Sequence, residues 1–287
     1  WGGHQLPWIL ARSKLSEFED SYGRPFALIE LPGSYYALVF RGEPDGQSLV
    51  DQADVDRWVA LWGAWLAGLG QEQGVVGASV TIETAPDTGT RLRREVEANV
   101  VEQAPEIAKQ MLRETIVELP AGSAVVRAYV TISFSATPRT GMKRRTTDEM
   151  AKDLATRIPS MIGELSQTGA GMVRPMTAIE LCRVVRTAYD PAADALFDVA
   201  AMTGQEVDIS WTEAGPVASE AAWDSYRHDS GVSMTWSMTD APRGLVHSGI
   251  LARLLGPHHA IARKRVTNLY RKVEAVRASQ IVYADVS

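Results

Sequence analysis

The alternation of apolar and polar positions predicts β-strands in the first half of the chain. An apolar run and a second run rich in β-branched and aromatic residues flank the turn signal Pro32-Gly33, which indicates a hairpin. Further along, apolar side chains again recur at every second residue. The predicted strands cover 26–31, 34–41, 75–84 and 125–135. Residues 1–23 lack such a pattern, and we expect them to be loosely ordered.

Apolar residues at three- and four-residue spacing predict helices between these strands. The clearest helix covers 51–69, and we interpret its three tryptophans, Trp58, Trp62 and Trp65, as core residues. A later helix contains Pro159, which should bend or break it. Another begins with the capping-box pattern of Thr177 and Glu180. These additional helices are expected at 92–119, 147–169 and 177–189.

The pattern is less regular in the last third of the chain. Residues 192–220 are ambiguous, and Asp229-Ser-Gly indicates a hairpin between short strands. The expected elements are strands at 225–227, 231–238 and 260–273, a short strand or connector at 172–176, and a helix at 242–255. The whole order predicts an α+β fold with two mixed or antiparallel sheets and helices on one face. Two ferredoxin-like halves would satisfy this order.

The same order predicts two domains. We place the first α+β domain at 1–190 and a second, smaller α+β portion at 191–287, with the boundary within 191–220. A chain of 287 residues is long enough for either two such domains or one large one.

Charge argues against one class of function. The net charge is −6, and residues 1–120 carry 10 Lys and Arg against 18 Asp and Glu. The remaining residues carry 19 against 17. The chain as a whole therefore lacks the basic character of a nucleic-acid-binding protein, and no specific nucleic acid is predicted as a partner.

The sequence lacks the motifs of nucleotide-driven enzymes. A phosphate-binding P-loop ends in Gly-Lys-Ser/Thr, but none of the six lysines directly follows a glycine. The pattern Gly-x-Gly-x-x-Gly is also missing. His258 and His259 are adjacent at a turn, which is a poor arrangement for zinc. We therefore predict no catalytic residue, no cofactor and no metal site.

Four residues invite a comparison with serine hydrolases. His228 and Asp229 are adjacent, and Ser225 and Ser230 are close by, but no nucleophile-elbow motif accompanies them. The single cysteine, Cys182, lies in an apolar stretch and is interpreted as an inert buried thiol. One cysteine allows no intrachain disulfide, which fits a reducing compartment.

A basic loop is the candidate docking site. Four of the seven residues from 139 to 145 are cationic, namely Arg139, Lys143, Arg144 and Arg145. Such a loop can bind anionic lipid, nucleic acid or an acidic partner protein. The alternative is an ordinary solvated loop.

The order of several sequence segments resembles a known family. The run FALIELPGSYYALVFR at 26–41, followed by the helix at 51–69 and the strand at 75–84, resembles the non-motor amino-terminal region of conjugation-type (type IV) secretion ATPases. Later segments follow in the same order. They are AYVTISF at 128–134, MTAIEL at 176–181, YRHD at 226–229, TDAP at 239–242 and LARLL at 251–255.

More closely, the chain resembles an actinobacterial membrane-protein family encoded with conjugative and integrative elements, in which the motor ATPase is a separate chain. This resemblance implies a non-catalytic domain at the cytoplasmic face of the plasma membrane that links a membrane base to a motor in trans. Other channel subunits and a second copy of the chain are further expected partners. The chain begins abruptly at Trp1, so we expect it to be a piece of a longer protein. It shows no membrane span itself, and the resemblance implies that transmembrane helices precede it in that longer protein.

Two alternatives remain open from the sequence. The chain could be an accessory component of an ESX-type (type VII) secretion system, or an enzyme of unknown class. An enzyme should contain a pocket with convergent polar groups. A docking domain should instead expose apolar or charged surface.

Overall fold

The structure of the chain is a computed structural model that describes most of its residues. The described residues are 6–44, 50–86, 104–118, 124–137, 141, 143–205, 207–239, 252–256, 261, 263–273 and 277–280. They form helices and antiparallel sheets, which confirms the predicted α+β class.

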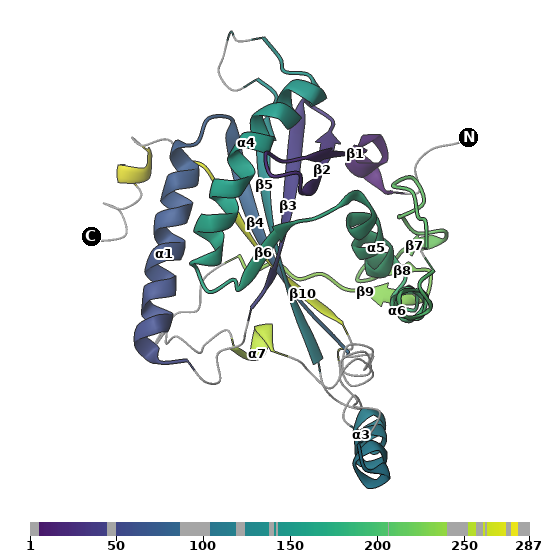
Figure 1. Cartoon of the computed structure of the whole chain (residues 1–287). Coiled ribbons are helices and arrows are strands. Elements are labelled where there is room, and N and C mark those ends of the chain that lie inside the picture. Colours follow the sequence, from purple (N-terminus) through teal and green to yellow (C-terminus); the bar gives the residue numbers. More distant parts are fainter. Residues whose placement is uncertain are drawn as a thin grey trace. The chain divides into compact units, whose positions relative to one another are not determined.

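A seven-stranded sheet is the larger of two sheets (Figure 1). Its strands follow the order β1-β2-β3-β5-β4-β10, and β6 also pairs with β3. The strands are β1 (Lys14–Glu19), β2 (Pro25–Leu31), β3 (Tyr35–Glu43), β4 (Val75–Pro86), β5 (Ala124–Ser135), β6 (Met172–Pro175) and β10 (Lys264–Arg271). The hairpin predicted from Pro32-Gly33 is confirmed, because β2 pairs antiparallel with β3 around that turn.

Strand β3 organises the sheet because it pairs with three other strands. On one side, residues 35–42 pair with β5. On the other side, residues 35–38 pair with β2 and residues 40–43 pair with β6. The connectivity β3-α1-β4-β5-α4-β6, with β6 beside β3 and β5 between β3 and β4, is that of a ferredoxin-like fold. The ferredoxin-like expectation therefore holds for this sheet.

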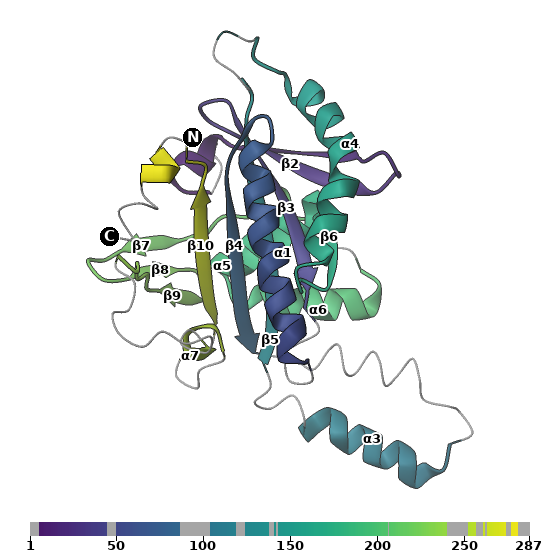
Figure 2. The same ribbon diagram turned by 90° about the vertical axis from the view of Figure 1, so that its left-hand side faces the viewer.

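Helices α1 (Gln52–Gln71) and α4 (Thr147–Ser166) cover the same face of this sheet, as Figure 2 shows. Their apolar faces and the inner face of the sheet form the main core. Its most deeply buried side chains are Phe26, Leu28, Tyr36, Leu38, Phe40, Ile132, Phe134, Met150, Leu154, Ile158 and Leu165. Of the three tryptophans of α1, Trp65 is buried and stacks on Trp62 with ring centroids 4.9 Å apart.

Helix α4 shows how local sequence sets an element boundary. It begins at Thr147, as predicted, and the N-cap residue before it, Thr146, forms a reciprocal capping box with Glu149. The Glu149 backbone donates to Thr146 Oγ1 at 3.3 Å, and the Thr146 backbone donates to Glu149 Oε2 at 2.8 Å. Pro159 lies inside the helix, which continues to Ser166 without a break.

The expectation that residues 1–23 are loosely ordered is wrong for most of that range. Residues Trp8–Arg12 form a 3₁₀ helix, and β1 pairs with β2 in a continuous antiparallel register. The turn between them is fixed by Asp20, whose carboxylate accepts from the backbone of Tyr22 at 2.8 Å and of Arg24 at 2.9 Å. Tertiary pairing therefore orders a segment whose own pattern is weak.

The second sheet contains three short strands in the order β7-β8-β9. These are β7 (Ser219–Ala221), β8 (Tyr226–His228) and β9 (Gly231–Ser233). The predicted hairpin at Asp229 is confirmed, but the predicted strand over 231–238 is wrong beyond Ser233. Helices α5 (Ala178–Tyr189) and α6 (Ala193–Thr203) precede this sheet. In the described residues, this part does not repeat the ferredoxin-like order.

Two further helices overlap with predicted ones. Helix α3 (Glu106–Glu118) matches the end of the helix predicted over 92–119, and α7 (Ala252–Leu255) matches the end of the one predicted over 242–255. The earlier parts of both predictions lie outside the described residues.

The chain forms two compact units whose segments alternate along the sequence. The small-sheet unit consists of 1–7, 82–126 and 179–266, and the large-sheet unit consists of 8–81, 127–178 and 267–287. Neither unit coincides with the predicted domains at 1–190 and 191–287, so that division stays a prediction.

Candidate functional site

The predicted basic loop lies at the start of α4 in the large-sheet unit. Arg139 is outside the described residues. Arg145 is half-buried, and its guanidinium lies 3.0 Å from the carboxylate of Asp153. Arg144 lies 3.7 Å from Glu30 but keeps more than half of its side chain exposed, and Lys143 is exposed. Arg145 therefore helps to anchor the loop, while Lys143 and Arg144 remain the residues to which the docking prediction applies.

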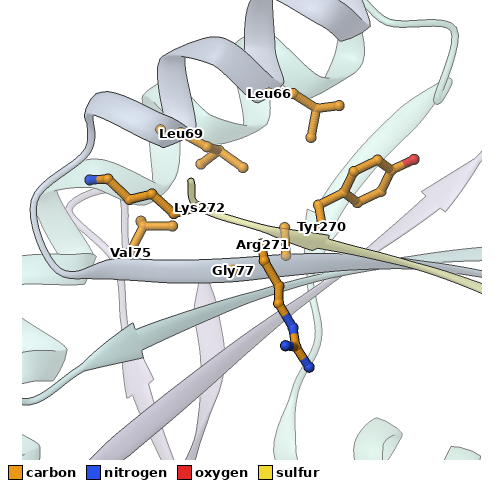
Figure 3. Close-up of a pocket in the computed structure, with 9 residues that line it drawn as sticks. Leu66, Leu69, Val75, Gly77, Tyr270, Arg271 and Lys272 are labelled. Atoms are coloured by element: carbon orange, nitrogen blue, oxygen red, sulfur yellow. The ribbon is translucent and has the colours of Figure 1, made fainter. Parts of the chain in front are cut away.

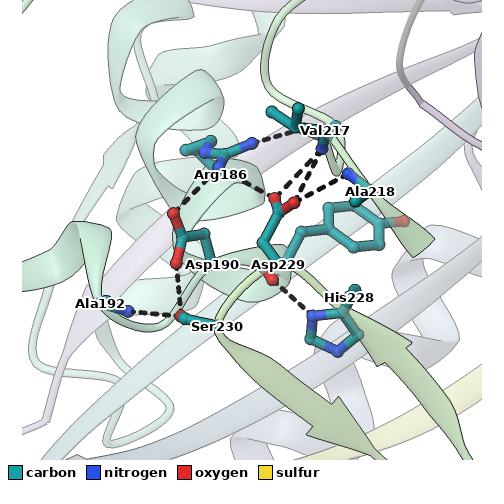
Figure 4. Close-up of polar contacts among 10 residues, drawn as sticks. Arg186, Asp190, Ala192, Val217, Ala218, His228, Asp229 and Ser230 are labelled. Carbon is teal, nitrogen blue, oxygen red and sulfur yellow. Dashed lines mark hydrogen bonds and ion pairs between the residues drawn. The ribbon is translucent and has the colours of Figure 1, made fainter. Parts of the chain in front are cut away.

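A denser polar network lies in the small-sheet unit, where α5 ends (Figure 4). Its centre is Arg186, whose Nη2 lies 2.9 Å from carboxylate oxygens of both Asp190 and Asp229. Its Nη1 donates to the carbonyl oxygen of Gly215 at 2.7 Å. One arginine thus connects the end of α5, the loop before β7 and the β8–β9 turn.

Asp229 has an unusual backbone conformation for a residue with a side chain. Its φ angle is +37°, in a region where Asp is tolerated because its carboxylate can satisfy nearby backbone groups. Here the carboxylate accepts from the backbone of Val217 at 3.0 Å and of Ala218 at 2.9 Å. These bonds fix the β8–β9 turn against the segment that leads into β7.

The next residue, Ser230, fixes the same turn to the junction between α5 and α6. Its hydroxyl donates to the carboxylate of Asp190 and accepts from the backbone of Ala192 at 3.1 Å. Burial alone would raise the pKa of Asp190, but the Ser230 hydroxyl and the Arg186 guanidinium outweigh it and lower that pKa. Asp190 is therefore ionised at neutral pH, as its ion pair requires.

His228 is a structural core residue of this hairpin. It is 3% exposed, and its ring packs against Tyr189 and Tyr226. Its Nδ1 contacts the carbonyl oxygen of Tyr189, which can only accept, so Nδ1 carries the proton. Nε2 then accepts from the Ser233 hydroxyl at 2.5 Å. The ring thus connects β8 to the end of α5 through Nδ1 and to β9 through Nε2.

The serine-hydrolase combination considered from the sequence is not formed. The carboxylate of Asp229 binds Arg186 and two backbone N–H groups rather than the His228 ring. The Ser225 hydroxyl donates to Asp224 at 3.1 Å. These contacts hold the hairpin in position, and they leave the histidine without an orienting carboxylate.

Exposed apolar side chains recur at every second residue from β9 into the segment that follows it. We call Val232, Met234, Trp236 and Met238 the apolar strip; all four are exposed, and Trp236 is 80% exposed. They alternate with Ser233, Thr235 and Ser237, which are also exposed. Trp223, in the β7–β8 turn, is 100% exposed. Because β9 ends opposite the start of β8, the chain leaves β9 at the end of the sheet where Trp223 lies.

Helix α6 adds a second exposed apolar group in the same unit. Leu196, Val199 and Met202 recur at three-residue spacing and are all exposed. Isolated exposed apolar residues are normal, but contiguous groups on a monomer usually mark an interaction surface. Sequence reasoning missed both groups, since it left 192–220 ambiguous and predicted only a strand over 231–238.

A buried charge cluster stabilises the small-sheet unit. Glu83 is 1% exposed and accepts from Arg263 Nη1 at 2.6 Å and from Arg265 Nε at 2.7 Å. Arg263 also lies 2.5 Å from Asp194 at the start of α6. A buried carboxylate held by two arginines is a structural arrangement, since its charge is compensated in place.

The large-sheet unit contains a small pocket beside the end of α1 (Figure 3). Its volume is about 150 Å³, and its lining is mainly apolar and includes Leu66, Leu69, Val75 and Tyr270. In Figure 3 the guanidinium of Arg271 points away from Leu66 and Leu69. Ligand pockets usually measure about 300–1,000 Å³ and contain convergent polar groups. This pocket meets neither condition.

Other reactive groups are similarly constrained. Among the described residues, no three His, Cys, Asp or Glu side chains are grouped so as to hold a metal ion. No described helix combines the length and the apolar composition needed to cross a bilayer. The prediction that Cys182 is buried is confirmed, and burial, assisted by the charge of Asp208, raises its pKa to about 11.

No protein-family model matches the chain, and no curated protein matches it.

Proposed function

We propose that this chain is a non-catalytic protein-docking domain of a conjugation-type (type IV-like) secretion machine. In this role it links a membrane base to a separate motor ATPase at the cytoplasmic face of the plasma membrane. Other channel subunits are the further partners. The secretion setting is inferred from the order of sequence segments that resemble the non-motor region of those ATPases.

The observation that carries the docking function is the exposed apolar surface of the small-sheet unit. Burying one large apolar side chain contributes about 1.5–3 kcal/mol. The side chains of the apolar strip and of Trp223 are exposed in the isolated chain, so their burial by a partner would contribute this free energy to binding. Binding energy in protein interfaces is concentrated in such residues, with tryptophan the most enriched.

The polar network supports this function by holding the surface in one conformation. The β8–β9 turn is fixed by ion pairs and hydrogen bonds of Asp229, Ser230 and His228 to neighbouring segments. A surface that is ordered before binding loses less conformational entropy when the partner arrives. The network therefore raises affinity without contacting the partner.

The test is an association experiment with the separate motor ATPase expected beside this gene. Association would be measured by light scattering at about 0.05 and 0.5 M salt, since charged contacts weaken as screening increases. The variants are Trp236→Ser in the apolar strip and the pair Lys143→Ala and Arg144→Ala in the basic loop. Leu269→Ser, an equally exposed apolar residue of β10, is the matched control.

Each result points to a different conclusion. Salt-resistant association that Trp236→Ser abolishes and Leu269→Ser preserves supports docking through the apolar strip. Salt-sensitive association that the loop pair abolishes supports docking through the basic loop. Binding to ESX-type components but not to a conjugation motor would support the alternative that the chain belongs to an ESX-type (type VII) secretion system. Absence of binding to either would overturn the secretion assignment.

A further inference from the structure

We infer that the partner of the apolar strip is a second copy of this chain; this rests on the proposed docking function, and it leaves Lys143 and Arg144 of the basic loop for the motor. Two copies pair their 232–238 segments antiparallel, so that the two three-stranded sheets join into one continuous sheet. Each copy then supplies a strand partner for the edge of β9 that is unpaired among the described residues, and apolar side chains of the two copies contact one another across the new strand pair.

The first support is the mismatch between sequence pattern and strand pairing. Residues 231–238 alternate apolar and hydroxyl side chains, which is the pattern of a half-buried strand. Pairing with β8 stops at Ser233. Among the described residues, β9 is also the outermost strand of its sheet. An open strand edge of this kind is a template for pairing with another chain.

The second support is the absence of charge along this edge. Residues 230–239 contain no Asp, Glu, Lys or Arg. Natural proteins usually protect open edges with charges, especially lysine. A neutral edge can face an identical edge without like-charge repulsion, which favours a second copy over an oppositely charged partner.

The third support is the amount of exposed apolar area. Trp223 and Trp236 together expose on the order of 400 Å², because a Trp side chain carries about 200 Å². The remaining residues of the apolar strip raise this value to on the order of 700 Å². A partner in a standard interface contributes about 800 Å². The exposed apolar area is therefore comparable in size with the share that one partner contributes to a standard interface.

The pattern also fixes the register. A two-fold axis at Thr235 places Met234 opposite Trp236 of the second copy and Val232 opposite Met238. All four residues of the apolar strip then lie on one face of the new strand pair. Thr235 lies opposite its own counterpart, whereas Ser237 lies opposite Ser233. Paired Cα atoms in such a ladder are about 4.5–5.5 Å apart, within the range that a disulfide can span.

Disulfide trapping tests both the association and the register. Thr235→Cys and Ser237→Cys would be oxidised at about 10–50 µM, a range in which moderate self-association is populated, and covalent dimer would be quantified on non-reducing gels. The native Cys182 is buried, so it does not contribute to cross-linking. We expect at least a tenfold higher dimer yield from Thr235→Cys than from Ser237→Cys. Equal yields, or no dimer from Thr235→Cys, would overturn the inferred pairing.

Sedimentation of the wild-type chain provides an independent readout. We expect a concentration-dependent monomer–dimer equilibrium that Trp236→Lys weakens at least tenfold and Leu269→Lys leaves unchanged. A strictly monomeric wild type would refute self-association. A monomeric wild type that still binds the motor in a Trp236-dependent manner would retain the docking function and assign the strip to that partner. If the wild type is a monomer and Trp236→Lys lowers its thermal midpoint by several degrees, the apolar strip packs against another part of the same chain, and self-association is refuted.

Discussion

Glycine 171 offers the sharpest test of how the large sheet is built. It lies just before β6, has a φ angle of +67°, and forms an isolated parallel bridge with Glu43. A Cβ at this position would lie against the carbonyl oxygen of Glu43 and 2.7 Å from its carbonyl carbon. Both atoms belong to the backbone, so no side-chain rotation relieves the overlap. Gly171→Ala must therefore displace the pairing of β3 with β6.

The expected cost follows from comparing three glycines of the large-sheet unit. Gly23 has a φ angle of +73° and open space around an added Cβ, so Gly23→Ala should cost only the left-handed strain of about 1 kcal/mol. Gly169, at φ +79°, faces the Trp58 ring at 2.7 Å, and the ring can shift. We expect the free energy of unfolding to fall by about 2–3 kcal/mol in Gly169→Ala and by about 4 kcal/mol or more in Gly171→Ala.

Urea unfolding followed by tryptophan fluorescence would measure these differences, since α1 carries three of the rings. Gly23→Ala is the matched control, because it imposes the same backbone strain without the steric overlap. The free energies of unfolding should rank Gly23→Ala, Gly169→Ala and Gly171→Ala in order of increasing loss. A Gly171→Ala variant within about 0.5 kcal/mol of Gly23→Ala would show that β6 does not pack on β3 as described.

Three further predictions concern the small-sheet unit. Glu83→Ala should lower the free energy of unfolding by about 3–5 kcal/mol in urea titrations, because it leaves two arginines without their shared carboxylate; a loss below 1 kcal/mol would contradict this. The lowered pKa of Asp190 means that its stabilisation is present above the ordinary value of 3.8 and is lost as pH falls through the folded-state pKa. The stability difference between wild type and Asp190→Asn should therefore shrink below about pH 4, and a constant difference would refute the pairing. Cys182 should resist a thiol reagent such as Ellman's reagent in the native state and react in urea, because it is buried and its pKa is raised to about 11; rapid native labelling would contradict its burial.

The sequence pattern was sufficient where local propensity and tertiary environment agree. Strands β4 and β5 and helix α1 were placed within a few residues, since their apolar positions face the core that the pattern implies. Strand β1 was missed because its short sequence is mixed and charged, and its order comes from pairing with β2. No property of a single segment reveals that pairing.

The candidate docking surface illustrates the opposite failure. The alternation over 231–238 predicted a strand, but only Gly231–Ser233 forms one, because a pattern does not specify whether a partner strand exists within the same chain. Helix α6 was unrecognised because its apolar face is exposed and its apolar content extends around the helix. Periodicity therefore identifies apolar surfaces that are suited to burial. Only the structure shows which of them remain exposed in this chain.

The sheet order has a consequence for synthesis of the chain. The outer edge of β4 is covered by β10, and the contact between the Thr81 and Thr267 hydroxyls, 2.9 Å apart, joins residues separated by 186 positions. At ribosomal rates of about 5–20 residues per second, the edge of β4 waits on the order of 10–40 s for its neighbour. During that interval an apolar strand is open to other nascent chains, so heterologous production should benefit from chaperones that hold it until β10 emerges.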